Sequence, residues 1–144
     1  MRLPLAILMI ALSAAKVAAL PSQPTVDELK ARLPNAKPDE RARLSLEIAE
    51  RQVAAADRLY HDGKTEEAEA AIKDVVSYTD QAGQDMPSRH LKSAEISVRK
   101  MAHRLGDIKR TLAYDNQASV QSAIDALEKV RTRLLDRMFA KNKK

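Results

Sequence analysis

Apolar residues recur at alternating steps of three and four along the second half of this chain, with polar residues between them. That spacing is typical of helices that bury one face. It predicts two long helices, with a tight break between them at Asp115-Asn116. The apolar positions before the break are Leu91, Ala94, Val98, Met101, Leu105, Ile108 and Leu112, and those after it are Val120, Ala123, Leu127, Val130, Leu134 and Met138. Helices joined by so short a link must run antiparallel.

A second helical hairpin precedes this one. Proline is tolerated at the first helical position, so Pro38 predicts a helix start, and Gly63 can adopt the left-handed conformation that ends a helix. The next helix begins at Thr65, and Gly83 and Pro87 bracket the polar connection after it. The predicted apolar faces are Leu44, Ile48, Ala55 and Leu59 in the first helix, flanked by Ala49, Val53, Ala56 and Tyr60, and Ala68, Ala71, Ile72, Val75, Tyr78 and Ala82 in the second.

A short helix is predicted ahead of these four. Thr25 and Glu28 have the spacing of a capping box, and Leu33 before Pro34 ends the segment. Four longer helices with one apolar face each bury those faces most simply by packing together. We therefore expect an all-α fold, an antiparallel up-and-down four-helix bundle over residues 38–140 with the short extra N-terminal helix laid against it. Gly106 interrupts the third long helix and indicates a bend or a close helix contact there.

The N-terminal residues have the pattern of a secretory signal peptide. Arg2 precedes an apolar run over residues 3–15, which is too short to span about 30 Å of hydrocarbon, and small residues lead up to Ala19. We expect a signal peptide at residues 1–19, a leader at 20–37, the bundle at 38–140 and a basic tail at 141–144. The protein is then periplasmic or secreted, with no stable membrane span after cleavage. Lys16 leaves open that the segment is retained as an anchor.

Composition excludes several kinds of site. The chain has no cysteine, so disulfides and sulfur-ligated metals are ruled out. Aromatic residues make up 3% of the chain, which argues against nucleic-acid stacking surfaces and most cofactor pockets. We expect no nucleic-acid partner and no cofactor.

Charge divides the chain into two unlike parts. Residues 20–86 hold nine Lys and Arg against fourteen Asp and Glu, a net charge of −5, whereas residues 87–144 hold fourteen against six, a net charge of +8. One interpretation is that the two hairpins attract each other inside the bundle. The other is an exposed basic strip that binds a polyanion, such as a lipid headgroup, a lipopolysaccharide phosphate or a wall polymer. The candidate residues of that strip are Arg99, His103 and Arg110 on one helix and Lys129, Arg133 and Arg137 on the next.

Catalytic and metal chemistry find little support. His103 and Asp107 are one helical turn apart, but no nucleophile accompanies them. Neither His90 nor His103 has a glutamate three residues before it, as a di-iron bundle requires. The candidates for haem ligation are Met101, Met138 and His103, and both methionines lie on predicted core stripes, where methionine is ordinarily packing. We predict no enzyme and no catalytic or metal site.

Two resemblances accompany these patterns. Within residues 49–82, the positions Ala56, Leu59, Gly63, Ala68, Ile72 and Val75 resemble the helical hairpin of a tetratricopeptide repeat. Gln52 and Asp80 depart from that family, which usually has a large residue and a proline there. The mature chain also resembles small, uncharacterised secreted bacterial helical proteins, through Glu95-Ile96, the run from Lys109 to Ala113, and Arg137-Met138-Phe139. That resemblance implies no activity.

These observations together predict a non-enzymatic secreted protein that acts through surface binding. Its partner is an unknown protein or an envelope component. An adaptor or chaperone-like role is the first hypothesis, and binding of envelope polyanions through the basic C-terminal hairpin is the alternative. A small hydrolase or transferase is the third, and it requires a concave pocket with perturbed acids or bases.

Overall fold

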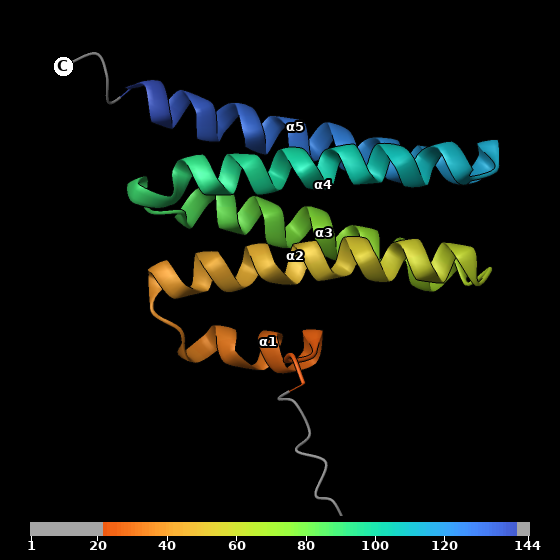
Figure 1. Ribbon diagram of the computed structural model, residues 1–144, viewed down its shortest axis with the longest axis horizontal. Coiled ribbons are helices and arrows are strands. Elements are labelled where there is room, and N and C mark those ends of the chain that lie inside the picture. Colours follow the sequence, from red (N-terminus) through yellow and green to blue (C-terminus); the bar gives the residue numbers. More distant parts are fainter. Residues whose placement is uncertain (1–21, 141–144) are drawn as a thin grey trace, which may run out of the picture.

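The computed structural model describes residues 22–140, and every regular element in that range is helical. The α-helices are α1 (Val26–Arg32), α2 (Pro38–His61), α3 (Thr65–Asp85), α4 (Leu91–Thr111) and α5 (Gln117–Ala140). Single 3₁₀ turns lie at Leu33–Asn35, Ser88–His90 and Tyr114–Asn116. The all-α bundle with its short first helix is confirmed (Figure 1). The predicted signal peptide and basic tail lie outside the described residues.

The bundle consists of two helical hairpins packed together, α2 with α3 and α4 with α5. Each long helix reverses the direction of the one before it (Figure 1). Between the hairpins, α3 packs on α5 and α2 packs more sparsely on α4. Helices that run the same way therefore meet across the hairpin interface, and α3 and α4 lie diagonally opposite.

The main core fills the space between the four long helices. Its fully buried side chains include Val53, Val75, Val98, Leu105 and Leu127. The predicted stripes of α4 and α5 are buried throughout apart from Leu112 and Met138, which are partly buried at helix ends.

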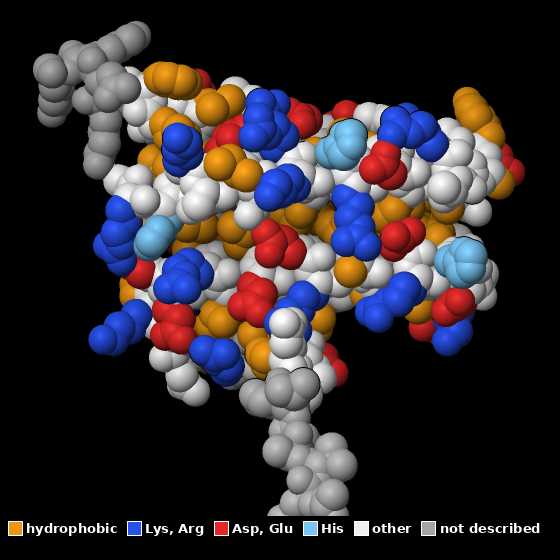
Figure 2. Space-filling view, in the orientation of Figure 1, with side chains coloured by type: hydrophobic (Ala, Val, Ile, Leu, Met, Phe, Trp, Pro, Cys, Tyr) orange, Lys and Arg blue, Asp and Glu red, His pale blue; other side chains and the backbone are white. Residues whose placement is uncertain are grey.

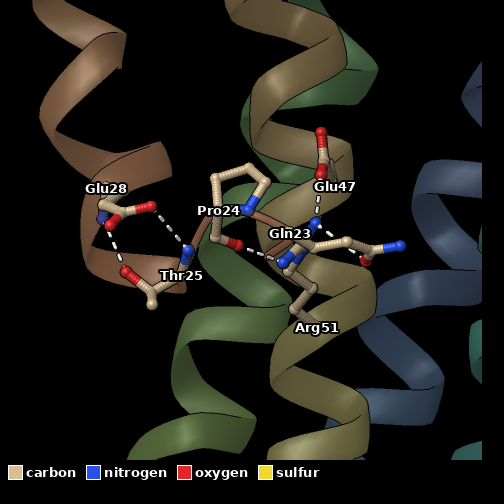
Figure 3. A network of polar contacts seen from close by, with 6 residues as sticks. All are labelled: Gln23, Pro24, Thr25, Glu28, Glu47 and Arg51. Atoms are coloured by element: carbon tan, nitrogen blue, oxygen red, sulfur yellow. Dashed lines mark hydrogen bonds and ion pairs between the residues drawn. The ribbon is translucent and has the colours of Figure 1, made fainter. Parts of the chain in front are cut away.

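The first helix lies beside α2 (Figure 1). It packs there through a separate, smaller apolar cluster. Its buried members are Leu29, Ala36, Leu44 and Ile48. The predicted capping box is present, because Glu28 N–H donates to Thr25 Oγ1 at 3.2 Å and Thr25 N–H donates to Glu28 Oε2 at 3.0 Å (Figure 3). Arg51 of α2 donates to the backbone oxygen of Pro24 and so ties down the residues before α1 (Figure 3).

Most helix ends lie where local signals predict them. Pro38 occupies the first turn of α2, and Gly63 has a φ of +74° between α2 and α3. Ala55 and Leu59, predicted for the core face of α2, are only partly buried, whereas Ala42 and Ser45 are fully buried. The face of α2 is thus rotated from the predicted one, because α1 and α3 share it. Gln117, not Asp115 or Asn116, bridges the turn before α5, with Nε2 donating to the oxygen of Leu112 at 3.0 Å.

Two glycine predictions are wrong. Gly83 does not end α3; the helix continues through it to Asp85, and Gly83 is buried. A Cβ at Gly83 would lie 2.6 Å from Val130 Cγ1, so the missing side chain permits the close approach of α3 and α5. Gly106, where a bend or close contact was predicted, lies in an unbroken α4, and a Cβ there would meet nothing within 4 Å.

Candidate polyanion-binding face

A row of Lys, Arg and His side chains runs along the outer face of α4. Lys92 and Arg110 are 18 residues apart, which is five turns, so they point the same way, and Arg99 and His103 lie between them in nearly the same direction. The row is about 27 Å long at 1.5 Å per residue. All four side chains are exposed, His103 by 80% and Arg110 by 70%. Lys100 is exposed beside them.

The register of α4 in the core turns this row outward. Ala94, Val98, Met101, Leu105 and Ile108 are buried on the opposite side of the helix. Figure 2 shows Lys and Arg side chains over α4, and it also shows them among the carboxylates along α2 below it. We call Lys92, Arg99, Lys100, His103 and Arg110 the α4 row. Arg99, His103 and Arg110 were predicted for this row, but Lys92 and Lys100 were not. The apolar stripe of α4 identifies the buried side of the helix, and both lysines lie on the other side.

Asp107 is the one carboxylate on this side of α4. Arg110 donates to it, and His103 Nε2 lies 3.7 Å from its second oxygen. The other acid of α4, Glu95, has a side chain only 10% exposed and accepts from Arg131 of α5 at 2.7 Å. Most of the positive charge in the α4 row therefore has no acidic neighbour on its own helix.

The predicted candidates on α5 do not join the α4 row. Arg133 donates to Asp80 of α3. Arg137 donates to the backbone oxygens of Gly83 at 2.9 Å and Met86 at 2.7 Å, where α3 ends. Lys129 is exposed on α5. The close contact at Gly83 directs Arg133 and Arg137 toward α3, and the predicted strip is divided between two faces.

Ion pairs between the hairpins support the first interpretation of the charge asymmetry. Arg89, Arg104 and Arg133 of the second hairpin pair with acids of the first. Their partners are Asp39, Asp57 and Asp80, and the Arg104–Asp57 separation is 3.5 Å. Each such surface pair contributes about 0–1 kcal/mol. Attraction between the two hairpins thus explains the positions of Arg89, Arg104 and Arg133, whereas the α4 row faces solvent.

A shallow trough of about 900 Å³ lies on the outer face of α2. Gln23 and Arg32 line it on the side of α1, and His90, Ala94 and Ser97 line it on the side of α4. Its floor is of mixed charge, and Arg51, which reaches over it, pairs with Glu47 at 2.7 Å (Figure 3). Lys30 and Tyr60, whose pKa values are raised by a hydrogen bond to Asp74 and by burial respectively, do not line it.

The described residues give no geometry for metal or haem binding. No group of three or more His, Asp or Glu side chains within residues 22–140 is placed to hold a metal ion. Met101 is buried in the core and Met138 packs against it, while His103 is exposed. Among the helices of this range, none has the length and apolar character needed to cross a membrane.

Comparison with known proteins adds no assignment, because no family model, curated protein or solved structure matches the chain. The functional argument therefore depends on the chain's own surface.

Proposed function

We propose that this chain is a non-enzymatic protein that binds a polyanion on the outer face of α4. The observation that supports it is the α4 row itself, five exposed Lys, Arg and His side chains along one helix with Asp107 as the one carboxylate among them. Cations that are already paired internally gain little from a ligand, whereas unpaired ones can replace the counterions of a polyanion.

The cellular setting is part of the same proposal. If the N-terminal segment directs export, the polyanions within reach are lipopolysaccharide phosphates, wall polymers and lipid headgroups. All of them attract a cationic row by the same long-range electrostatic mechanism, and this attraction weakens as salt shortens the Debye length.

Charge reversal tests the proposal. The triple variant Lys92→Glu, Arg99→Glu, Lys100→Glu changes only exposed side chains, so its fold should be retained. Heparin binding, followed by fluorescence anisotropy between 50 and 200 mM salt, should weaken by roughly ten- to a hundredfold, and the slope of log affinity against log salt should fall by about two to three.

The matched control reverses three exposed cations on the other long helices, Arg58→Glu, Lys73→Glu and Lys129→Glu. It changes the net charge by the same amount and should bind heparin nearly as well as the parent chain at each salt concentration. Equal losses in the two triple variants would show that net charge alone matters, and binding that does not depend on salt would also contradict the proposal.

An adaptor or chaperone-like role is the second candidate, and the same face supports it. A protein partner with an acidic segment would contact the α4 row through the same charges. Competition and salt distinguish the two roles. A polymer ligand is displaced by free polyphosphate in proportion to its charge. A folded partner that also buries apolar surface remains bound at 500 mM salt.

A further inference from the structure

The first helix packs outside the core that the four long helices share. Its buried side chain, Leu29, belongs to the small cluster with Ala36, Leu44 and Ile48, and none of the described members of the main core lies on α1. In Figure 1, α1 lies at the edge of the bundle, next to α2. The main core is therefore complete without α1.

One side of α1 matches the surface on which it lies. Val26, Leu29 and Leu33 follow one another at steps of three and four, so they share one side of the helix and its end. All three belong to the small cluster or pack against it. We call the residues of α2 and α3 that face this side the α1-binding surface, namely Leu44, Ile48, Asp74 and Tyr78.

Polar contacts fix the position of α1 on this surface. Lys30 Nζ donates to Asp74 Oδ2 at 2.6 Å and lies 5.5 Å from the centre of the Tyr78 ring. Gln52 Nε2 donates to the same carboxylate oxygen at 2.7 Å. These contacts require only the sequence of α1 and that of the surface, so α1 of another copy of the chain can make them equally well.

The connection between α1 and α2 keeps the two helices separate. Ala36 and Lys37 are extended, with ψ angles of 143° and 156°. They lie between a 3₁₀ turn that contains Pro34 and the first residue of α2, Pro38. Proline lacks the N–H that continues a helix, and the residue before a proline favours extended angles. An extended connection is equally compatible with an α1 that points away from its own α2.

Both α1 and the surface it covers need a partner. Seven residues are too few for a stable isolated helix in water, for which about 12–15 are needed. Leu44 and Ile48 are apolar, so their exposure to water is unfavourable. A detached α1 is therefore stabilised by any α1-binding surface within reach, its own or that of another copy.

We infer that α1 is exchangeable: the α1-binding surface receives α1 of a second copy, and two chains exchange their first helices reciprocally into a dimer. Such an exchange preserves the contacts of each bundle and changes mainly the connection at residues 34–38. A single chain meets its own α1 at an effective concentration of mM order, as is usual for a short linker. The closed monomer should therefore predominate at micromolar concentrations and the dimer should appear near 1 mM.

Cross-linking between different chains tests the exchange, because the sequence has no cysteine. Lys30→Cys in one full chain and Asp74→Cys in a second, isotope-labelled chain place one thiol on α1 and one on its surface. Loss of this ion pair costs little, since both side chains are one-third exposed. Incubation together at about 1 mM, followed by a short bismaleimide, should give a mixed dimer, and incubation at about 10 µM should give at least tenfold less.

The matched control for random collisions mixes Asp74→Cys with Lys129→Cys, whose thiol lies at an exposed position of α5. It should give several-fold less mixed dimer than the first pair at the same concentration. Equal yields from the two mixtures at about 1 mM would overturn the exchange.

A change in the connection should favour the dimer. Pro34→Ala, Pro38→Ala restores two N–H groups and lets α1 and α2 continue as one helix, which carries α1 away from its own surface. Both prolines are exposed, so core packing is retained. Light scattering after size exclusion should detect dimers at concentrations at least about tenfold lower than for the parent chain. Pro87→Ala, at the connection between α3 and α4, is the control and should behave like the parent.

Leu29→Asn in the double-alanine variant identifies the surface used. It removes the buried side chain of α1, so the dimer should revert to a monomer. A dimer that persists would show association through another face and would overturn the exchange. A folded double-alanine variant that stays monomeric would do the same, and if that variant does not fold, the cross-linking of the two single-cysteine chains decides.

Discussion

Two glycines inside helices show how differently one residue type can act. A Cβ at Gly83 would fall within 2.6 Å of Val130 Cγ1, whereas a Cβ at Gly106 would point into open space. Sequence patterns cannot distinguish them, because both are single glycines in long helical runs. The difference comes from α5, which approaches α3 at Gly83 and leaves Gly106 of α4 uncovered.

Alanine at each position should therefore have opposite effects. Gly83→Ala should lower the free energy of unfolding by about 1–3 kcal/mol, because Val130 or the whole of α5 must shift. Gly106→Ala should raise it by about 0.5–1 kcal/mol, because alanine restricts the unfolded chain and nothing obstructs its methyl group. Urea unfolding followed by circular dichroism measures both. Destabilisation by Gly106→Ala would show that α4 is covered at that point.

Helix ends were predictable where their signals are local. Thr25 and Glu28 cap α1 over three residues, and Gly63 ends the α2 region through its own backbone conformation. The end of α3 was mispredicted because its last carbonyls are bound by Arg137, more than fifty residues away in sequence. A side chain that comes from another hairpin leaves no signal near the helix end.

Removal of that cap should loosen the end of α3. Arg137→Ala should cost about 1–3 kcal/mol in unfolding free energy, because two charge-assisted hydrogen bonds to half-buried carbonyls are lost. Hydrogen exchange should accelerate at residues 83–86 while α2 stays protected. Lys129→Ala, at an exposed position of the same helix, is the control and should change neither quantity. Uniform acceleration across the bundle would assign Arg137 a global packing role instead.

The overall architecture followed from the sequence more fully than the candidate site did. Apolar spacing identifies which face of each helix is buried, but it cannot say that α3 meets α5 and α2 meets α4, since any apolar face can cover another. The site depends on that pairing. Four-residue steps place Lys129, Arg133 and Arg137 on one side of α5, and the last two are bound by acceptors of α3 and of the residue that follows it. Arg99, His103 and Arg110 lie together because α4 has a single unambiguous core stripe.

Alkaline pH should weaken the attachment of α1. Lys30 Nζ donates to Asp74 at 2.6 Å, which raises the pKa of Lys30 above its ordinary 10.5. A raised pKa means that this stabilisation is complete below pH 10.5 and is lost as the pH rises through the folded-state value. The stability gap between the parent chain and Lys30→Met should therefore be about 0.5 kcal/mol at pH 9 and should narrow as the pH rises beyond 10.5.

Burial also raises the pKa of Tyr60, which contributes an alkaline loss of the same sign in both proteins. The comparison with Lys30→Met cancels that contribution. Urea titrations at pH 9, 10 and 11.5 provide the measurement. A gap that stays constant over this range would mean that the ammonium group of Lys30 adds nothing to the stability.

The separate apolar cluster beneath α1 determines how the molecule responds to mechanical load. A pull applied upstream of Ser22 should reach the hydrogen bond between Arg51 and Pro24 first and then the small cluster that holds Leu29 and Ile48. Tyr78 is the side chain that packs against both clusters. Under tension, α1 should detach from α2 as a unit before the four long helices unfold. Its detachment lengthens the chain and so reduces the force on those four helices.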